Sequence, residues 1–238
     1  MGENEVVLLE KAKDEESIYN WAKAAKLYEQ ISIYYLDKNI SEKVAETYKM
    51  VGHSYERAAE TVETAKDYLE LNQHSADAYK EAAKHFKQIG NSAEELECEA
   101  EISYVNGLIS RSAKETKMLF SQSYGFFINA SEVFCKNEDQ KSVARTLSRA
   151  TLILWYIVNY CSDQKEIEQL CQKCINIGEK AWKLSKEVKN YLVDMKVQSI
   201  SKNDLLKLLE QFEDMEDREK VLRIVYEEFR REYSSDIK

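Results

Sequence analysis

Proline is absent from this 238-residue sequence, and glycine occurs only six times. Both residues end or weaken helices, so a chain that is poor in both suits long, uninterrupted helices. Long apolar runs are missing as well, because the longest, LILWYIV at 152–158, is far too short to span a bilayer. The acidic N-terminus, with only VVLL as its apolar run, does not match a secretory signal. We therefore expect a cytoplasmic protein without an integral membrane segment.

A net positive charge is lacking, and histidine is scarce. The formal net charge is −9 and the chain has three histidines, His53, His74 and His85. A general nucleic-acid binder carries a basic face, so we expect no nucleic-acid partner. With so little glycine there is no Walker loop or dinucleotide fingerprint to hold phosphate. The sequence thus predicts neither an enzyme nor a cofactor.

Cysteine is present in an odd number, five, spread along the chain. This usage is typical of free thiols in a reducing compartment rather than of a disulfide framework. Cys171 and Cys174 form a Cys-x-x-Cys pair, but a structural zinc site usually needs four ligands. We interpret both as core residues and predict no metal site.

Apolar residues recur at spacings of three and four along most of the chain, which predicts helices. Gly90 is a predicted C-terminal stop and Ser92 the next N-cap, with Asn39 or Ser41 and Ser162 or Asp163 as further caps. The predicted helices lie near 16–37, 41–61, 64–89, 92–114, 117–136, 139–161 and 163–189. After an alternating stretch at 190–201, two shorter amphipathic helices are predicted at 202–213 and 217–233.

One pattern of residues occurs several times in the sequence. It consists of an aromatic residue at position i, two small residues at i+3 and i+4, and an apolar residue at i+7, and we call it the stripe. These positions share one face of a helix, and the small residues allow a neighbouring helix to approach closely. Such a face is buried only if helices stack in an array. We therefore predict an all-α, right-handed array (solenoid) of antiparallel helix pairs over 1–190, with 191–238 as a C-terminal helical cap or appended two-helix module. The clearest copies are Trp21, Ala24, Ala25, Tyr28 and Ile31; Tyr79, Ala82, Ala83, Phe86 and Ile89; and Phe127, Ala130, Ser131 and Phe134.

The stretch Trp-x-x-Ala-Ala-x-x-Tyr at 21–28 resembles the first half of a tetratricopeptide repeat. Over residues 15–135, the long predicted helices and the lack of proline most resemble the SNAP type of this superfamily. SNAP proteins are the adaptors that link SNARE bundles to their AAA+ unfoldase. The resemblance implies a vesicle-trafficking adaptor whose partners are a helical bundle and an AAA+ ATPase. The chain ends Asp236, Ile237, Lys238, which loosely matches the acidic-leucine-basic tail of that family. The match implies that Asp236 and Ile237 contact the ATPase.

The 14-3-3 family is the other all-helical, acidic candidate of this length. Lys49 matches its phosphate-binding lysine, but the arginines that should follow fall on Tyr55 and Ala59. A phosphate bound beside Lys49 would lack the arginines that form bidentate hydrogen bonds with it, so phosphopeptide binding of that kind is disfavoured.

We expect a non-catalytic protein–protein interaction scaffold or adaptor that binds a partner segment on one face of the array. If the first long helix lines that face, the candidate contacts are Lys23, Lys26, Tyr34 and Tyr35. A regulatory or structural homo-oligomeric helical protein is the alternative function, and the oligomeric state stays open.

Overall fold

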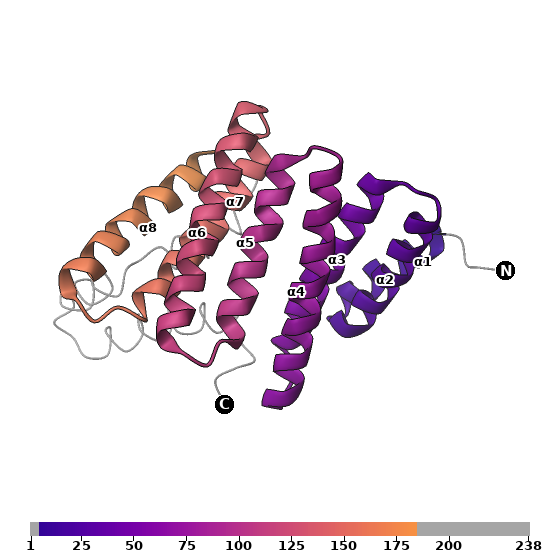
Figure 1. Ribbon diagram of the computed structural model, residues 1–238, viewed down its shortest axis with the longest axis horizontal. Helices are drawn as coiled ribbons and strands as arrows, with labels where there is room; N and C mark the ends of the chain where they lie inside the picture. The colour runs from indigo at the N-terminus through magenta and orange to yellow at the C-terminus, as the bar shows by residue number, and fades with distance from the viewer. Residues whose placement is uncertain (1–4, 185–238) are drawn as a thin grey trace. The chain divides into compact units, whose positions relative to one another are not determined.

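The computed structural model describes residues 5–184, and all of their regular structure is α-helix (Figure 1). The predicted all-helical class is therefore confirmed for this part of the chain. The predicted extended link and the two C-terminal helices lie outside the described residues. The eight described helices are α1 (Glu5–Ser17), α2 (Trp21–Asp37), α3 (Ser41–Ala59), α4 (Ala65–Gln88), α5 (Ser92–Ile109), α6 (Ala113–Lys136), α7 (Gln140–Val158) and α8 (Gln164–Leu184).

The helix predicted over 16–37 is wrong at its start, because the chain turns there. α1 ends at Ser17 and α2 begins at Trp21. The reversal is made at Tyr19, whose φ is 61°. Non-glycine residues seldom adopt this left-handed conformation. No glycine or proline marks the turn, so the sequence pattern continues through it.

Four helix–helix turns in the described chain share one backbone geometry. Each places a left-handed residue after the helix: Tyr19, Asn39, Gly90 and Glu138. The N–H of that residue donates to the carbonyl three positions back, and the next N–H donates to the carbonyl five positions back. This is the Schellman pattern, which satisfies carbonyls that a helix end leaves open. The predicted stop at Gly90 is one of these turns, with a φ of 74°.

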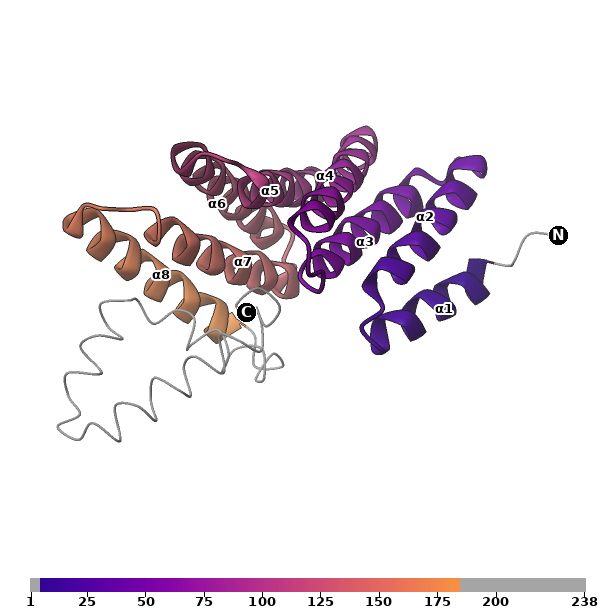
Figure 2. The same cartoon turned by 90° about the horizontal axis from the view of Figure 1, so that it is seen from below.

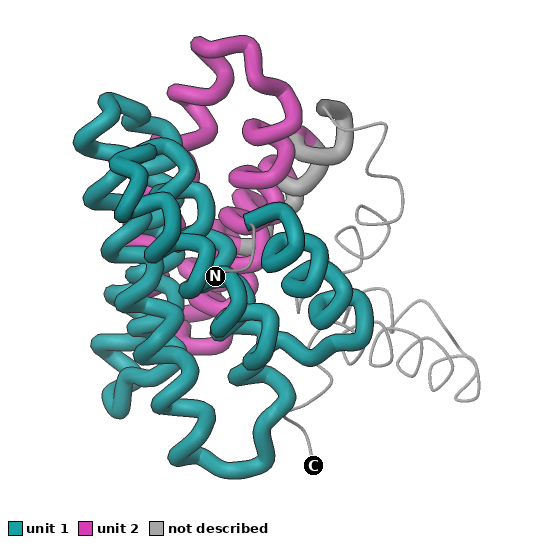
Figure 3. Tube along the Cα trace, turned by 90° about the vertical axis from the view of Figure 1, so that its right-hand side faces the viewer, with its two compact units in different colours: residues 1–119 teal, residues 120–238 magenta. Residues whose placement is uncertain are grey.

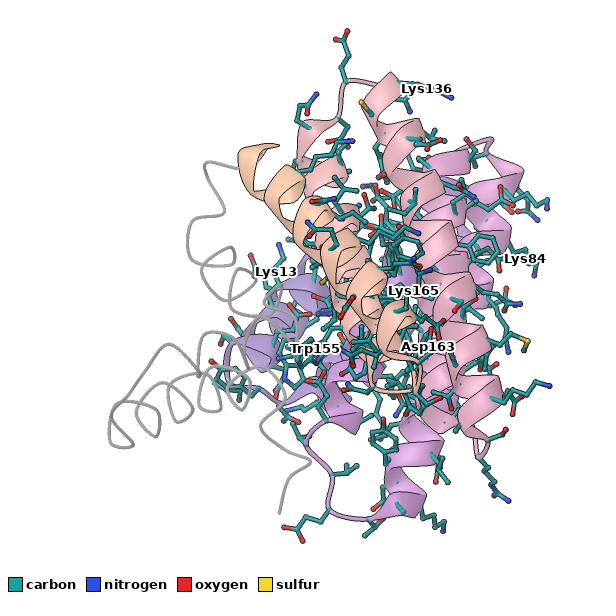
Figure 4. The ribbon with its side chains drawn as sticks, turned by 90° about the vertical axis from the view of Figure 1, so that its left-hand side faces the viewer. Lys13, Lys84, Lys136, Trp155, Asp163 and Lys165 are labelled. Carbon is teal, nitrogen blue, oxygen red and sulfur yellow. The ribbon has the colours of Figure 1, made fainter. Side chains whose placement is uncertain are left out.

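Two of the predicted N-caps differ in the structure by one position. The cap of α5 is Asn91 rather than Ser92, since the Asn91 side chain accepts the Glu94 N–H at 3.3 Å. At the start of α3 the cap position is held by Ile40, which makes no side-chain bond, rather than by Asn39 or Ser41. The predicted cap at Asp163 is confirmed: its Oδ2 accepts the Glu166 N–H at 3.1 Å at the beginning of α8 (Figure 4).

The chain divides into two compact units, residues 1–119 and 120–238, and the division falls inside α6 (Figure 3). In the first unit, consecutive helices pack against one another from α1 to α5 (Figures 1 and 2). In the second unit, α7 packs against α8. The predicted boundary near residue 190 lies outside the described residues and stays a prediction, as do the solenoid arrangement and its hand.

The core of the first unit contains the repeated stripe. Tyr48 stacks on His85 and Tyr55 stacks on His74, so residue numbers rise along α3 as they fall along α4. The two helices are therefore antiparallel. Two stripe positions differ from the prediction: Trp21 is only half-buried, and Ile89 is 40% exposed because it lies past the last turn of α4. The remaining positions are buried as predicted: Ala24, Ala25, Tyr28 and Ile31 on α2, and Tyr79, Ala82, Ala83 and Phe86 on α4.

The core of the second unit contains the third copy of the stripe, whose members Phe127, Ala130, Ser131 and Phe134 are all buried. Arg149 lies over the ring of Phe127 and Arg145 over that of Phe134, which shows that α7 packs along α6. The thiol of Cys174 on α8 donates to the carbonyl of Thr151 on α7. Packing between consecutive helices, which the stripe predicted, is thus present in both units.

Candidate binding surface on α2 and α3

The predicted contacts Lys23 and Lys26 lie on the solvent side of α2. Lys23 is 60% exposed, and its Nζ lies 2.5 Å from Glu15 Oε1. This ion pair lowers the pKa of the Glu15 carboxyl, since a neighbouring cation favours the charged form. Lys26 is exposed as well. Both lysines can therefore reach a partner without any change in the fold.

The predicted contacts Tyr34 and Tyr35 are half-buried and bind within the protein. The Tyr34 hydroxyl bonds to the Glu5 carboxylate, which raises the pKa of Tyr34 and joins the beginning of α1 to the end of α2. Tyr35 packs against the core of the first unit, and burial raises its pKa. Asp236 and Ile237 lie outside the described residues, and their predicted role stays a prediction.

A different group of side chains gathers where α1 ends, α2 begins and α3 ends. We call it the Trp21 surface, and it consists of Ile18, Tyr19, Trp21, Met50, His53 and Arg57. The Trp21 ring meets the His53 ring edge-on at 6.0 Å between centroids. Arg57 Cζ lies 5.7 Å from the centroid of the Trp21 ring, and the Tyr19 ring meets Trp21 edge-on at 6.3 Å. One indole thus connects the turn, α2 and α3.

Helix spacing places the α3 members of this surface together. Met50, His53 and Arg57 are three and four residues apart, so they lie on one face of α3. The opposite face of α3 is buried against its neighbours, through residues such as Val51 and Tyr55. Arg57 is further oriented by Glu60, whose Oε2 is 2.7 Å from Arg57 Nη1. A cation–π contact at such a site contributes about 0.5–1 kcal/mol, enough to favour this arrangement of Arg57 before any partner binds.

The composition of the Trp21 surface is that of a protein interface. Tyr, Trp, Met and Arg are enriched at interfaces and dominate their hot spots. Tyr19 is 74%, Ile18 67% and Met50 39% exposed. The spacing of Met50, His53 and Arg57 could have been found in the sequence. The exposure of Ile18 and Tyr19 could not, because it depends on a turn that the sequence does not signal.

Lys49, which the sequence pattern aligned with a phosphate-binding lysine, forms ion pairs within the fold. Its Nζ lies 2.5 Å from Glu94 Oε2 and 3.0 Å from Glu97 Oε2. The Glu97 side chain is almost fully buried, and an ion pair of this kind is strongly destabilising to break from one side. Lys49 therefore links α3 to α5, two helices that are not consecutive in the chain.

The side chain of Cys171 lies outside those that the structure describes, so the predicted role of the Cys171–Cys174 pair stays a prediction. Cys174 is buried and donates to Thr151 at 3.5 Å. Over the part of the chain that the structure covers, no three His, Cys, Asp or Glu side chains converge on a point where a metal ion could bind.

Within residues 5–184, no helix combines the length and apolar character that a membrane crossing requires. No protein-family model matches the chain, and no curated protein sequence is significantly similar to it.

Proposed function

We propose that this protein is a non-catalytic protein–protein interaction scaffold and that the Trp21 surface is its contact with the partner. The observation that carries the proposal is the exposure of Ile18 and Tyr19 beside the Trp21–Arg57 pair. Large apolar side chains at this exposure cost free energy in water and gain it when a partner covers them. Their neighbours are already ordered by mutual contact, which reduces the entropy lost on binding.

The partner is a helical segment or a helical bundle. The surface follows one face of α3, with anchors at spacings of three and four, and this spacing suits an apposed helix. Lys23 and Lys26 are exposed on the other side of α2 and are proposed as separate contacts of the partner.

The more specific form of the proposal is a cytoplasmic SNAP-like adaptor that binds a SNARE-type bundle and stimulates an AAA+ ATPase. It rests on the Ala- and aromatic-rich stripes of residues 15–135 and on the final residues Asp236 and Ile237. In this form the array binds the bundle and the C-terminal residues contact the ATPase.

The experiment measures the affinity of the full chain for a purified SNARE-type four-helix bundle by biolayer interferometry. The test variant is Met50→Asp and the control is Leu69→Asp on α4, because the two side chains are 39% and 38% exposed. We expect Met50→Asp to weaken binding about tenfold or more, as truncation or charging of a central contact does. Leu69→Asp should leave the affinity unchanged.

Equal effects of the two substitutions would remove the Trp21 surface from the contact. A wild-type chain that binds no such bundle would remove the SNAP-like form. In a second assay, deletion of residues 236–238 should abolish stimulation of the AAA+ ATPase without weakening binding to the bundle. Stimulation that survives the deletion would contradict the role given to Asp236 and Ile237.

A further inference from the structure

The turn between α1 and α2 carries a residue that is poorly suited to it. The four Schellman turns require a left-handed residue, and Gly90 and Asn39 are residue types that adopt this conformation readily. Tyr19 is not, because its Cβ crowds the backbone at positive φ. Its ring is largely exposed, so core packing does not hold it in place. The chain is therefore strained at this reversal.

The same residues are compatible with a continuous helix. No glycine or proline lies between Glu16 and Trp21. Asn20 occupies the N-cap position of α2 but makes no side-chain cap; its amide donates to Glu15 Oε2 at 2.7 Å instead. The side chains thus do little to define a helix start at this point.

Straightening the turn would also preserve its backbone hydrogen bonds. The Tyr19 N–H now donates to Glu16 O and the Asn20 N–H to Glu15 O. In a continuous helix the two donors simply exchange these acceptors, because each N–H then bonds four positions back. The first N–H groups of α2, which a helix start leaves without intrahelical acceptors, would gain the carbonyls of Ser17 and Ile18.

The contacts that hold α1 are made chiefly with α2. Two side chains of α1, Leu8 and Ala12, are buried. Polar contacts join Glu5 to Tyr34, Glu15 to Lys23, and Glu16 to Tyr28 and also to Ser54 of α3. None of these contacts depends on α1 and α2 belonging to the same chain.

We propose that this protein forms a domain-swapped dimer. In it, α1 and α2 of each copy join into one helix, and α1 packs on α2 of the other copy. The partner is a second copy of this chain because only α1 presents the complete set of contacts for the α2 face. Short hinge turns under strain favour this exchange, in which the closed contacts are remade between chains. The inference does not rest on the proposed function, since it requires no other protein, and the Trp21 surface, which includes the turn residues Ile18 and Tyr19, then belongs to the monomer.

The first test measures the monomer–dimer equilibrium of the full chain by sedimentation, after refolding at a series of concentrations. We expect wild-type dimers and roughly 100-fold weaker dimerisation in Tyr19→Gly, since glycine relieves the left-handed strain and disfavours the continuous helix at both hinges. The control is Asn39→Gly, the same kind of change in a turn of the same geometry inside the array. It should leave dimerisation unchanged.

The second test separates a swapped dimer from a dimer through another surface. One chain carries Glu15→Lys and the other carries Lys23→Glu, and the two are refolded alone and together. In a swapped mixed dimer, both α1–α2 contacts regain opposite charges, whereas each variant alone opposes like charges. We expect the ratio of the squared mixed-dimer concentration to the product of the two homodimer concentrations to exceed its statistical value by roughly fivefold or more, and this excess to fall in high salt.

Three results would overturn the proposal. The first is a wild-type chain that stays monomeric up to about 1 mM, a concentration that would detect even a millimolar Kd. The second is a mixture with statistical proportions of the three dimers. The third is an equal loss of dimer in Tyr19→Gly and Asn39→Gly.

Discussion

The α3 and α4 helices approach each other closely at Gly52, and Gly52→Ala tests how tightly they pack. A Cβ added there would lie 2.9 Å from Cγ, Cδ1 and Cδ2 of the Tyr79 ring. Carbon atoms in good contact are about 3.5–4.0 Å apart, so the ring would have to retreat by roughly half an ångström or more. The ring is fully buried, and its hydroxyl donates to Glu56 Oε2 at 3.3 Å, so its freedom to move is small.

Two effects of the substitution oppose each other. Alanine inside a helix is more stable than glycine by about 1 kcal/mol. Overpacking a tight core costs about 1–3 kcal/mol. Because the Tyr79 ring is held at both ends, we expect overpacking near the upper part of its range, about 2–3 kcal/mol, so Gly52→Ala should lower the free energy of unfolding by about 1–2 kcal/mol.

The control is Gly125→Ala in α6, where an added Cβ meets no atom within 4 Å. Only the helix-propensity effect then remains, so this variant should be more stable by about 0.5–1 kcal/mol. The two glycines lie in different units, and each is followed through one tryptophan. For Gly52→Ala, the substitutions Trp155→Phe and Trp182→Phe leave Trp21 as the single tryptophan, and its fluorescence then reports the unfolding of the first unit.

The measurement for both variants is urea unfolding followed by tryptophan fluorescence, with Trp155 as the reporter for Gly125→Ala. A Gly52→Ala variant as stabilised as Gly125→Ala would refute the close approach. A double-mutant cycle gives a sharper result: in a Tyr79→Ala background the ring is gone, and Gly52→Ala should become stabilising. The coupling between the two sites should be about 1–3 kcal/mol, and zero coupling would contradict the contact.

The remaining predictions concern the turns, one helix cap and the buried ion cluster. Gly90→Ala should cost about 1 kcal/mol of unfolding free energy, whereas Glu138→Gly in the turn of the same geometry should add about 0.5–1 kcal/mol, both by urea titration. Asp139→Ala should cost about 1 kcal/mol, because the Asp139 side chain accepts the N–H of the first turn of α7. The Ser142 hydroxyl and the Ser142 N–H both donate to the Asp139 carboxylate and lower its pKa, so the stabilisation is complete above the ordinary aspartate pKa and is lost as the pH falls through the lowered pKa. An acid titration of Asp139→Asn, which keeps a cap but cannot ionise, should lack this loss. Lys49→Met should cost about 3 kcal/mol in thermal unfolding, because the buried Glu97 loses a cation partner, and Glu97→Gln in the same chain should recover part of it.

How much of this structure the sequence predicts depends on what each pattern measures. Helix periodicity reports which face is buried, and the Ala-Ala stripe of α2 is buried as predicted. The same periodicity does not report a chain reversal, so it continued from Glu16 across Tyr19 into α2. α1 itself was missed because its charged residues are distributed around the helix and only Leu8 and Ala12 are buried.

The candidate surface shows the same limit. Lys23 and Lys26 were predicted as contacts from their place on α2, and both are exposed. Tyr34 was predicted as a contact from its place near a helix end. Its hydroxyl instead donates a hydrogen bond to Glu5. Glu5 belongs to α1, the helix that the periodicity missed. Pairwise contacts between helices, such as Arg57 over Trp21, depend on the packing register, which a single sequence does not contain.

The shared geometry of the turns indicates what fixes the fold of this chain. Glycine, asparagine, tyrosine and glutamate occupy the same left-handed position in four turns, although their intrinsic preferences for it differ widely. If the residue at the left-handed position determined whether the chain reverses, four turns with such different residues there would not have the same geometry. The reversal is therefore imposed by the buried faces on either side, which pack only when consecutive helices fold back on each other. The cost of a poor turn residue is then tolerated where the adjoining faces are large, as they are between α6 and α7. It weighs more at Tyr19, because α1 buries only Leu8 and Ala12, and this is why exchange of a helix between copies is expected there and not at Glu138.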